Sequence, residues 1–440
     1  MKFIFEFFLL FNIILLTSGA ILSIYNGPTD FSKKIIYYTS KGNSINKRCL
    51  ESALSLLRQK TCIDFWENES TYENSNGLIF KWNSSFCGTR YFGRREGISM
   101  IIDVNSDCDC NERKIQSYIL QAFGVIPEQT RPDRDRYVSI HERNIKNGTD
   151  MRYFKKYIVR NYYNFYEKEN EDFVLLYGRS YDYGSALHDE STAFSKNNNL
   201  TIIPQGFHWK VYLDMIGQKH TLGFLDLFFL NRYYCLGICN KDERTPNCNL
   251  RGYANPRNCK ECLCMYPFDS NSNCKSLISS HKECPTYKDA STNETTIRIL
   301  GKINCYMHIK TSEQLLIKVH LKNITISKNI NKICARSDGS VEIQYKEDKS
   351  TMGLCFCNMK HLPYVIVTES NDVIVSYRGT NESDYLEFTY KSIQKDQMFE
   401  AISENFNKEN DEIKKKLKAK KETKSLVDES DDISLSRGDD

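Results

Sequence analysis

Residues 111–137 read NERKIQSYILQAFGVIPEQTRPDRDRY, and this stretch decides how the rest of the chain is interpreted. Its first half places apolar residues at helical spacing, which predicts an amphipathic helix with a core-facing stripe. The stripe consists of Ile115, Ile119, Leu120, Ala122 and Phe123. Its second half is charged, and we expect Arg131, Asp133, Arg134 and Asp135 to form a charge network around the rigid Pro132.

Length and composition indicate a multidomain globular chain. With 440 residues, of which 40% are hydrophobic, the chain is long enough for two to four domains with their own cores. The net charge of +4 is small for this length, so the sequence gives no reason to expect a nucleic-acid partner.

The first twenty residues have the pattern of a secretory signal peptide. Met1 and Lys2 precede an apolar run, Phe3–Leu16, and small residues at 18–20 suit a cleavage site. A membrane anchor is the alternative, but the run is shorter than the ~20 residues that a spanning helix needs. No later stretch is apolar and long enough to span, so no transmembrane segment is expected.

Cysteines and glycosylation motifs agree with a secreted protein. Seventeen cysteines in short-spaced sets are typical of an oxidising compartment. The odd total means that at least one thiol is free or joined to another chain. Seven N-x-S/T motifs predict glycosylation at Asn68, Asn83, Asn147, Asn199, Asn293, Asn323 and Asn381.

Several short stretches resemble zinc metallopeptidases of the astacin family. The run from Glu128 to Val138, EQTRPDRDRYV, is similar to the segment that follows the family's active-site helix. Tyr181–Asp189, YDYGSALHD, resembles the family's turn YDYxSVMHY, and Thr61–Phe65 resembles its TCI.F signature. Shorter matches follow at 201–204, 216–219 and 231–235, so the resemblance covers roughly residues 33–235.

The resemblance also implies that the zinc site has been lost. The family motif HExxHxxGxxHE supplies three histidine ligands and a general-base glutamate. Anchored on Gly124 and Glu128, the ligand positions hold Ser117, Gln121 and Pro127, and the general-base position holds Tyr118. A hydroxyl and an amide oxygen are poor zinc ligands beside imidazole, and proline offers no donor.

Other positions give no replacement for this chemistry. In the turn, Leu187 replaces the family's methionine and Asp189 replaces its tyrosine. The eight histidines form no HxxxH or HxH pair, and Tyr118 is a poor base at neutral pH. We therefore expect no catalytic residue, no bound metal and no cofactor. In the family Glu128 would pair with the mature N-terminus, an expectation that depends on where the signal is cut.

The same resemblance implies a disulfide framework. In the first domain Cys62 should pair with Cys235, and Cys87 with Cys108 or Cys110, while the state of Cys49 stays open. Six later cysteines resemble an EGF-like module, and four more resemble a CUB domain. These imply the pairs Cys239–Cys259, Cys248–Cys262, Cys264–Cys274, Cys284–Cys305 and Cys334–Cys355, with Cys357 as the alternative partner of Cys334. A zinc cluster at Cys259 and Cys262 is disfavoured in an oxidised chain.

The expected fold class is α+β followed by all-β. An astacin-like domain of two subdomains should contain strands near 35–38, 78–80 and 98–102 and helices over 49–64 and 111–123. Alternating apolar residues at 315–321 and 364–367 predict strands of a CUB-like sandwich. The predicted division is signal 1–20, astacin-like domain 21–236, EGF-like module 237–275, CUB-like domain 276–395 and a charged tail 396–440 that is disordered or a frayed helix.

These features favour a secreted, inactive astacin homologue that binds extracellular proteins or peptides. One alternative is an active zinc metalloendopeptidase with a non-standard site. Another is an adhesive or matrix protein that uses its EGF-CUB arm, for which the Arg437-Gly438-Asp439 triplet is a weak indication. There is no room for a pro-segment before residue 33. A chain without zinc needs no segment to block the metal, but a truncated sequence would give the same pattern.

Overall fold

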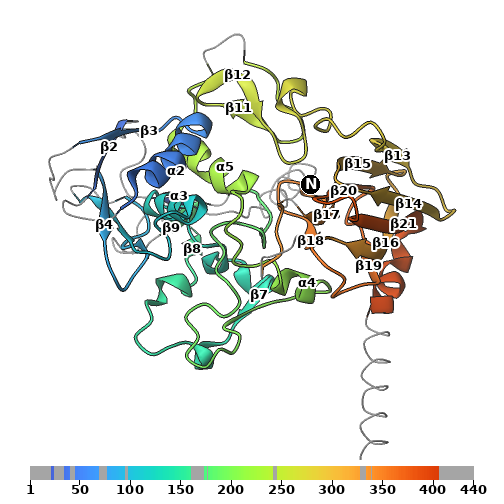
Figure 1. The fold of residues 1–440 in the computed structure, drawn as a ribbon, viewed down its shortest axis with the longest axis horizontal. Coiled ribbons are helices and arrows are strands. Elements are labelled where there is room, and N and C mark those ends of the chain that lie inside the picture. The colour runs from blue at the N-terminus through green and yellow to red at the C-terminus, as the bar shows by residue number, and fades with distance from the viewer. Residues whose placement is uncertain are drawn as a thin grey trace, which may run out of the picture.

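The computed structural model describes residues 21–23, 34–39, 45–68, 77–94, 98–159, 173–175, 177–240, 245–327, 333–337 and 339–405. The expected signal peptide, the Arg437-Gly438-Asp439 triplet and the end of the charged tail lie outside them. Figure 1 shows an N-terminal unit of helices and sheet on one side and a β-sandwich on the other, with a hairpin module above them. The α+β class with a C-terminal all-β sandwich is confirmed.

The first half of the N-terminal unit is a five-stranded sheet covered by two helices. The strand order is β3-β2-β4-β6-β5, and only the β5–β6 pair is antiparallel. The elements are β2 (Lys34–Thr39), α2 (Lys47–Lys60), β3 (Asp64–Glu67), β4 (Leu78–Trp82), β5 (Gly88–Thr89), β6 (Met100–Val104) and α3 (Glu112–Ala122).

Both predicted helices form, but the first ends at Lys60 and not at residue 64, because the chain is extended at Thr61 and Asp64 starts β3. The Asn46 side chain caps α2 by accepting from the amides of Arg48 and Cys49, and Asn111 caps α3 by accepting from Lys114. The apolar stripe of α3, including Ile115 and Ile119, is buried in the core beneath the sheet. Burial of these stripes, more than helix propensity, holds short helices in place.

The second half of the N-terminal unit consists of short elements joined by long connections. They are η2 (Glu128–Thr130), η3 (Arg134–Arg136), β7 (Val138–Ile140), η4 (Glu142–Asn144), η5 (Met151–Tyr153), β10 (Ile202–Pro204), α4 (Trp209–Leu213) and α5 (Phe224–Tyr234). Strands β7 and β10 pair antiparallel. A separate small sheet joins β1 (Ile21–Ser23), β9 (Phe173–Leu175) and β8 (Ile158–Val159) in that order.

The C-terminal half begins with a hairpin module and continues as a sandwich. The module contains β11 (Tyr253–Asn255), β12 (Asn258–Leu263) and η6 (Ser270–Ser272). One sheet of the sandwich has the order β13-β15-β20-β17-β18, and the other β14-β21-β16-β19. The strands are β13 (Tyr287–Asp289), β14 (Thr295–Leu300), β15 (Asn304–Lys310), β16 (Leu315–Thr325), β17 (Ser340–Gln344), β18 (Leu354–Phe356), β19 (Tyr364–Val367), β20 (Asp372–Arg378) and β21 (Tyr385–Gln394).

The start of the charged tail is packed. After η7 (Lys395–Gln397), residues 398–405 are helical. Ala401 and Ile402 are buried against Leu316 and Val367 of the sandwich. Of the two predicted alternatives, disorder and a frayed helix, the helix is the one found at the start of the tail, because apolar side chains on one helix face pack on the sandwich.

Most of the expected disulfides are present, and one prediction needs correction. The structure contains Cys62–Cys235, Cys87–Cys108, Cys239–Cys259, Cys248–Cys262, Cys264–Cys274 and Cys284–Cys305. Cys49 pairs with Cys110. The prediction of Cys334–Cys355 was wrong: Cys334 pairs with Cys357. Cys355 is held in the middle of β18 opposite Glu342 and stays a buried free thiol, whereas Cys357 follows the strand end.

The sandwich shares a hydrophobic core with the N-terminal unit. Tyr183, Tyr212 and Met215 lie in the same cluster of buried side chains as Tyr345 and Met352. Polar contacts cross the same boundary.

The Tyr212 and Tyr345 hydroxyls are 2.9 Å apart, His208 Nδ1 lies 2.8 Å from the Tyr364 hydroxyl, and the Met352 amide donates to Asp182 Oδ1 at 3.0 Å. The two units are therefore packed as one body at this face.

We expect Gly184→Ala to weaken this packing. A Cβ added at Gly184 would clash with the Met352 side chain and lie 2.5 Å from its Sδ, although the Gly184 backbone does not need the left-handed region. Overpacking of this kind lowers the free energy of unfolding by about 1–3 kcal/mol. Chemical denaturation followed by near-UV circular dichroism measures the change.

The exposed Gly206 provides the control for this substitution. Gly206 has a φ of 84°, and an added Cβ would meet no atom within 4 Å, so Gly206→Ala adds backbone strain without a packing clash. Equal stability of wild type and Gly184→Ala would contradict the tight docking of the sandwich on this turn.

Candidate functional site

Helix α3 places Ser117 and Gln121 one turn apart on a buried face. Ser117 is 1% exposed, and its hydroxyl donates to the Lys114 carbonyl at 2.8 Å. Gln121 is 3% exposed, and its Oε1 has no hydrogen-bond partner among the described residues. Tyr118 is half-buried, and burial raises the pKa of its hydroxyl. A base at this position would need a low pKa, so the geometry does not suit Tyr118 to that role.

The helix ends as the sequence predicts. Gly124 has a φ of 95°, and its amide donates to the Gln121 carbonyl at 2.9 Å. The Val125 amide donates back to the Leu120 carbonyl at 3.0 Å. This pair of bonds is the Schellman arrangement, in which a glycine in the left-handed region terminates a helix.

The donors at the expected zinc position do not fit zinc. Pro127 precedes η2 with a buried ring that carries no donor atom, and Ser117 already uses its proton inside the helix. Only the unpartnered Oε1 of Gln121 is available, and one neutral amide oxygen is a weak ligand for zinc. Throughout the described residues, no group of three or more His, Cys, Asp or Glu side chains is placed to hold a metal ion.

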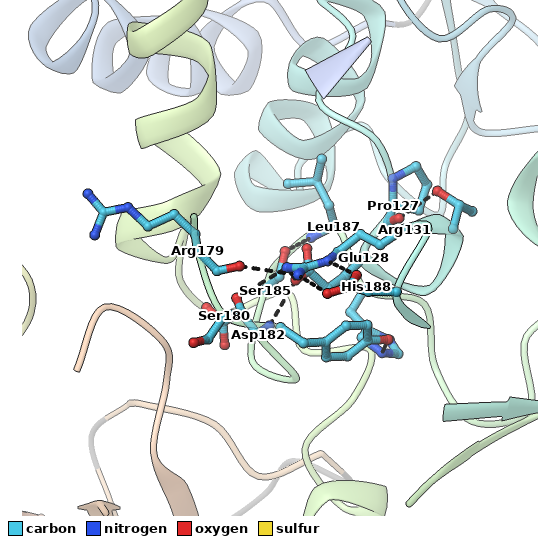
Figure 2. Close-up of polar contacts among 12 residues, drawn as sticks. Pro127, Glu128, Arg131, Arg179, Ser180, Asp182, Ser185, Leu187 and His188 are labelled. Carbon is cyan, nitrogen blue, oxygen red and sulfur yellow. Dashed lines mark hydrogen bonds and ion pairs between the residues drawn. The ribbon is translucent and has the colours of Figure 1, made fainter. Parts of the chain in front are cut away.

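The charged run after the helix is organised around Arg131, whose side chain is 0% exposed. Its Nη1 donates to Glu128 Oε1 at 2.6 Å, and its Nε and Nη2 form a two-pronged pair with Asp133 at 2.9 and 2.8 Å. The carbonyls of Ser180 and Arg179 accept the two remaining N–H groups at 3.1 and 3.2 Å. Figure 2 shows the guanidinium between Glu128 and the backbone of residues 179–180.

The expected charge contacts are present, but in two separate groups: Arg131 binds Asp133 and also Glu128, and Arg134 binds Asp135. Arg134 donates from Nε to Asp135 Oδ1 at 3.0 Å and from Nη1 to the Gln129 carbonyl at 3.0 Å. One buried positive charge faces two carboxylates at Arg131. Burial raises the pKa of Glu128 to about 7, although Arg131 opposes the shift. The expected contact of Glu128 with the chain terminus involves residues outside the described range.

The turn at 181–189 packs beneath α3 and is held by buried carboxylates. Asp182 accepts at Oδ1 from the Gly184 amide at 2.9 Å, while its own amide donates to Glu128 Oε1 at 2.8 Å. Asp226 of α5 accepts from the Ser185 hydroxyl at 2.6 Å and the Ala186 amide at 3.1 Å. Burial raises the pKa of both carboxyls, for Asp226 to about 6.

Leu187, His188 and Asp189 have structural partners in this turn. Leu187 is 1% exposed and joins the core under the sheet, as a volume-conserving replacement for methionine should. The Tyr181 hydroxyl lies 2.8 Å from His188 Nε2, and His188 Nδ1 lies 2.7 Å from the Asp189 carbonyl. Asp189 accepts at Oδ2 from Gln129 Nε2 at 2.7 Å, so its side chain is bound to the charged run.

Two structural residues of this site were not singled out from the sequence. Asp226 also accepts from the Gly223 amide at 2.7 Å, so it caps α5. The spacing Gly223-x-x-Asp226 before an apolar helix was a readable capping signal. Gln129 bonds Asp189 across a long loop, and no local pattern indicates that contact.

Comparison with known proteins assigns the N-terminal unit to a family. Residues 26–235 match the family model described as Astacin, a peptidase family. These residues are an astacin-family domain. Relatives include the zinc metalloproteinases nas-34 and dpy-31 of Caenorhabditis elegans, which are 25% and 26% identical to this chain. The matches cover 82% and 80% of this chain but 56% and 57% of those proteins, so the chain spans a little over half of their length.

A solved structure is also similar to part of this chain. It is high choriolytic enzyme 1, a hatching enzyme zinc-protease from Oryzias latipes, with 25% identity and a TM-score of 0.38. The match covers 49% of this chain and 98% of that one.

We expect Arg131→Met to be among the most damaging single substitutions in the astacin-family domain. It would leave Glu128, Asp133 and two buried carbonyls without their donor. Removal of one partner from a buried ion pair lowers the free energy of unfolding by about 3–5 kcal/mol. Arg136→Met, at an exposed position of the same run, is the matched control and should change stability by less than about 0.5 kcal/mol. Similar urea midpoints for the two variants would show that Arg131 does not hold the run in place.

His188 should make the domain less stable as the pH falls. Burial lowers the pKa of His188 from 6.5 to about 3, so the unfolded chain binds a proton in this interval that the folded chain does not. Stability from this group is present above pH 6.5 and is lost at up to about 1.4 kcal/mol per pH unit below it. His188→Gln should therefore lose less stability than wild type between these pH values, measured by denaturant unfolding.

The pH dependence of His188→Gln is compared with that of wild type because Asp189 and Asp226 change the folding stability in the opposite direction over the acidic range. Burial raises the pKa of each to about 6, so their contribution falls as the pH rises. His281→Gln, which replaces an exposed histidine outside this turn, is the control substitution. An NMR titration that shows the His188 ring protonating near its ordinary pKa would contradict this assignment.

Proposed function

We propose that this chain is a secreted, catalytically inactive astacin homologue that acts by binding extracellular proteins or peptides and carries no metal or other cofactor. The observation that carries the proposal is the set of side chains at the four catalytic positions, Ser117, Tyr118, Gln121 and Pro127. A zinc peptidase of this family needs a metal-bound water and a base to deprotonate it. Neither function can be assigned to a hydroxyl bonded within its helix, a phenol with a raised pKa, an amide or a proline.

The preserved surroundings favour a binding role over simple decay. The donors of Arg131, the cap at Gly124 and the disulfides of the domain remain in place, although a domain that has lost its chemistry needs none of them for catalysis. They keep the surface of the domain rigid, and a rigid surface binds a partner with a smaller entropic cost.

Several features support secretion and glycosylation. The described part of the chain contains eight disulfides, and no helix within it is long and apolar enough to cross a membrane. Five of the seven predicted glycosylation sites are exposed, namely Asn68, Asn147, Asn199, Asn293 and Asn381. Asn83 and Asn323 are half-buried.

The test is a paired measurement of zinc content and peptide cleavage. Full-length protein purified from a secreting eukaryotic host should carry well under one zinc per chain by mass spectrometry after dialysis against zinc. It should also leave a broad peptide library intact. Stoichiometric zinc together with cleavage that stops on chelation would overturn the proposal and favour the non-standard active site.

A restored variant provides the positive control. Ser117→His, Tyr118→Glu, Gln121→His and Pro127→His together return the family's ligands and base to α3 and to the turn after Gly124. Because good nitrogen ligands are worth about 10 kcal/mol or more in a zinc site, this variant should bind one zinc per chain. If neither protein binds zinc, the replaced side chains are not the reason for the loss, and the turn after Gly124 has a different geometry.

A further inference from the structure

A pocket lies between the last helix of the astacin-family domain and the hairpin module. It has a volume of about 460 Å³, which is within the range of small-ligand sites. Helix α5 contributes Phe228, Asn231 and Arg232 to one wall, and the loop before β11 contributes Arg251 to the other. Such junctions between domains are common places for ligand binding.

The charged side chains in the described lining of this pocket are all arginines. Arg179, Arg232 and Arg251 all line it, and its described lining residues include no Asp, Glu or Lys. Arg232 and Arg251 are exposed, so their guanidinium groups can reach a ligand without a large rearrangement. Three arginines with no carboxylate in the described lining make the pocket a place where an oxyanion is attracted.

The guanidinium of Arg179 lacks part of its hydrogen bonds among the described residues. It is 7% exposed, its Nη1 has no acceptor among the described residues, and its Nη2 reaches the Arg251 carbonyl only at 3.4 Å. Its carbonyl accepts from Arg131, while Figure 2 shows its side chain pointing away from that cluster. Burial lowers the pKa of Arg179, although the Asp348 carboxylate opposes the shift.

The Asp348 carboxylate does not complete the site. Asp348 of the sandwich attracts Arg179 electrostatically, but its Oδ2 accepts from the Ser180 amide at 3.2 Å and its Oδ1 from the Ser350 hydroxyl at 2.6 Å. Arg251 Nη1 lies 3.9 Å from the same carboxylate. A buried guanidinium whose Nη1 lacks an acceptor in the described part of the chain therefore remains beside the pocket.

Aromatic rings form the other part of the walls. The guanidinium carbon of Arg179 lies 4.2 Å from the Phe228 ring centroid, and that of Arg232 lies 5.9 Å from the Tyr177 centroid. Tyr253 adds a third ring to the lining. Stacking of this kind holds an arginine fork flat and leaves its edge free for a ligand.

We propose that this pocket binds an anionic aromatic side chain of a partner protein, and that sulfated tyrosine is the group whose chemistry fits it best. The sulfate would lie against the arginine forks, and the tyrosine ring would pack among the aromatic walls. The ring-lined walls and the absence of lysine among the described lining residues favour this ligand over a sulfated glycan. The choice of sulfate over phosphate rests on the proposed secretion.

The test uses full-length protein and a pair of short peptides that differ only in sulfation of one tyrosine. Calorimetry should detect the sulfated peptide and show binding at least about tenfold weaker for the unsulfated one. Arg232→Gln and Arg251→Gln should each weaken the sulfated peptide by roughly tenfold, because each removes a charge-assisted contact. Both positions are exposed, so the thermal midpoint of each variant should match that of wild type.

Arg143→Gln is the matched control, since Arg143 is exposed on η4 and does not line the pocket. Binding of a heparin oligosaccharide is measured in the same way. Three results would each overturn the proposal. The first is equal affinity for the two peptides, and the second is unchanged affinity in Arg232→Gln and Arg251→Gln. The third is heparin binding that needs these arginines while the sulfated peptide does not bind. The zinc and cleavage measurements are independent of these results, so failure of one proposal is distinguishable from failure of the other.

Discussion

A single buried guanidinium holds the second half of the astacin-family domain together. Arg131 has five N–H donors, and Glu128, Asp133 and the carbonyls of residues 179 and 180 accept all five. A buried arginine is costly unless each donor and the charge are matched, so the segments that supply these acceptors must arrive together. The run EQTRPDRD is explained by this requirement and does not depend on a metal.

The segment whose carbonyls bind Arg131 continues into the turn on which the sandwich packs. Asp182 donates its amide to Glu128 and accepts at Oδ1 from the Met352 amide. On the other side, Tyr183 and Tyr212 stack 3.8 Å apart in the core that the two units share. The charge cluster and the domain contact are thus consecutive parts of one structure, and a disturbance at either place reaches the other.

Local patterns in the sequence predicted the local structure. The stripe of α3, the end of this helix and the strands follow from spacing of a few residues, whereas the short-range cysteine pairs were implied by the family resemblance. The non-local features could not be predicted in this way. Cys355 and Cys357 lie two residues apart, so the sequence alone allows either to pair with Cys334. In the structure Cys355 lies within β18, opposite Glu342 of β17, and Cys357 forms the disulfide. The shared core and the packing of residues 401 and 402 depend on segments that meet only after folding. The same holds for Arg179, whose Nη1 has no acceptor among the described residues.

The docking of the sandwich on the turn has a consequence for recognition. Because the two units are packed as one body, the distance between the arginine-lined pocket beside α5 and the loops of the sandwich is fixed. A partner with two contact points at that spacing would meet the second one at high effective concentration once the first is bound. A partner with a different spacing would gain nothing from the second contact. Two individually weak contacts can therefore give a selective complex, because the fixed distance between them selects partners with the matching spacing.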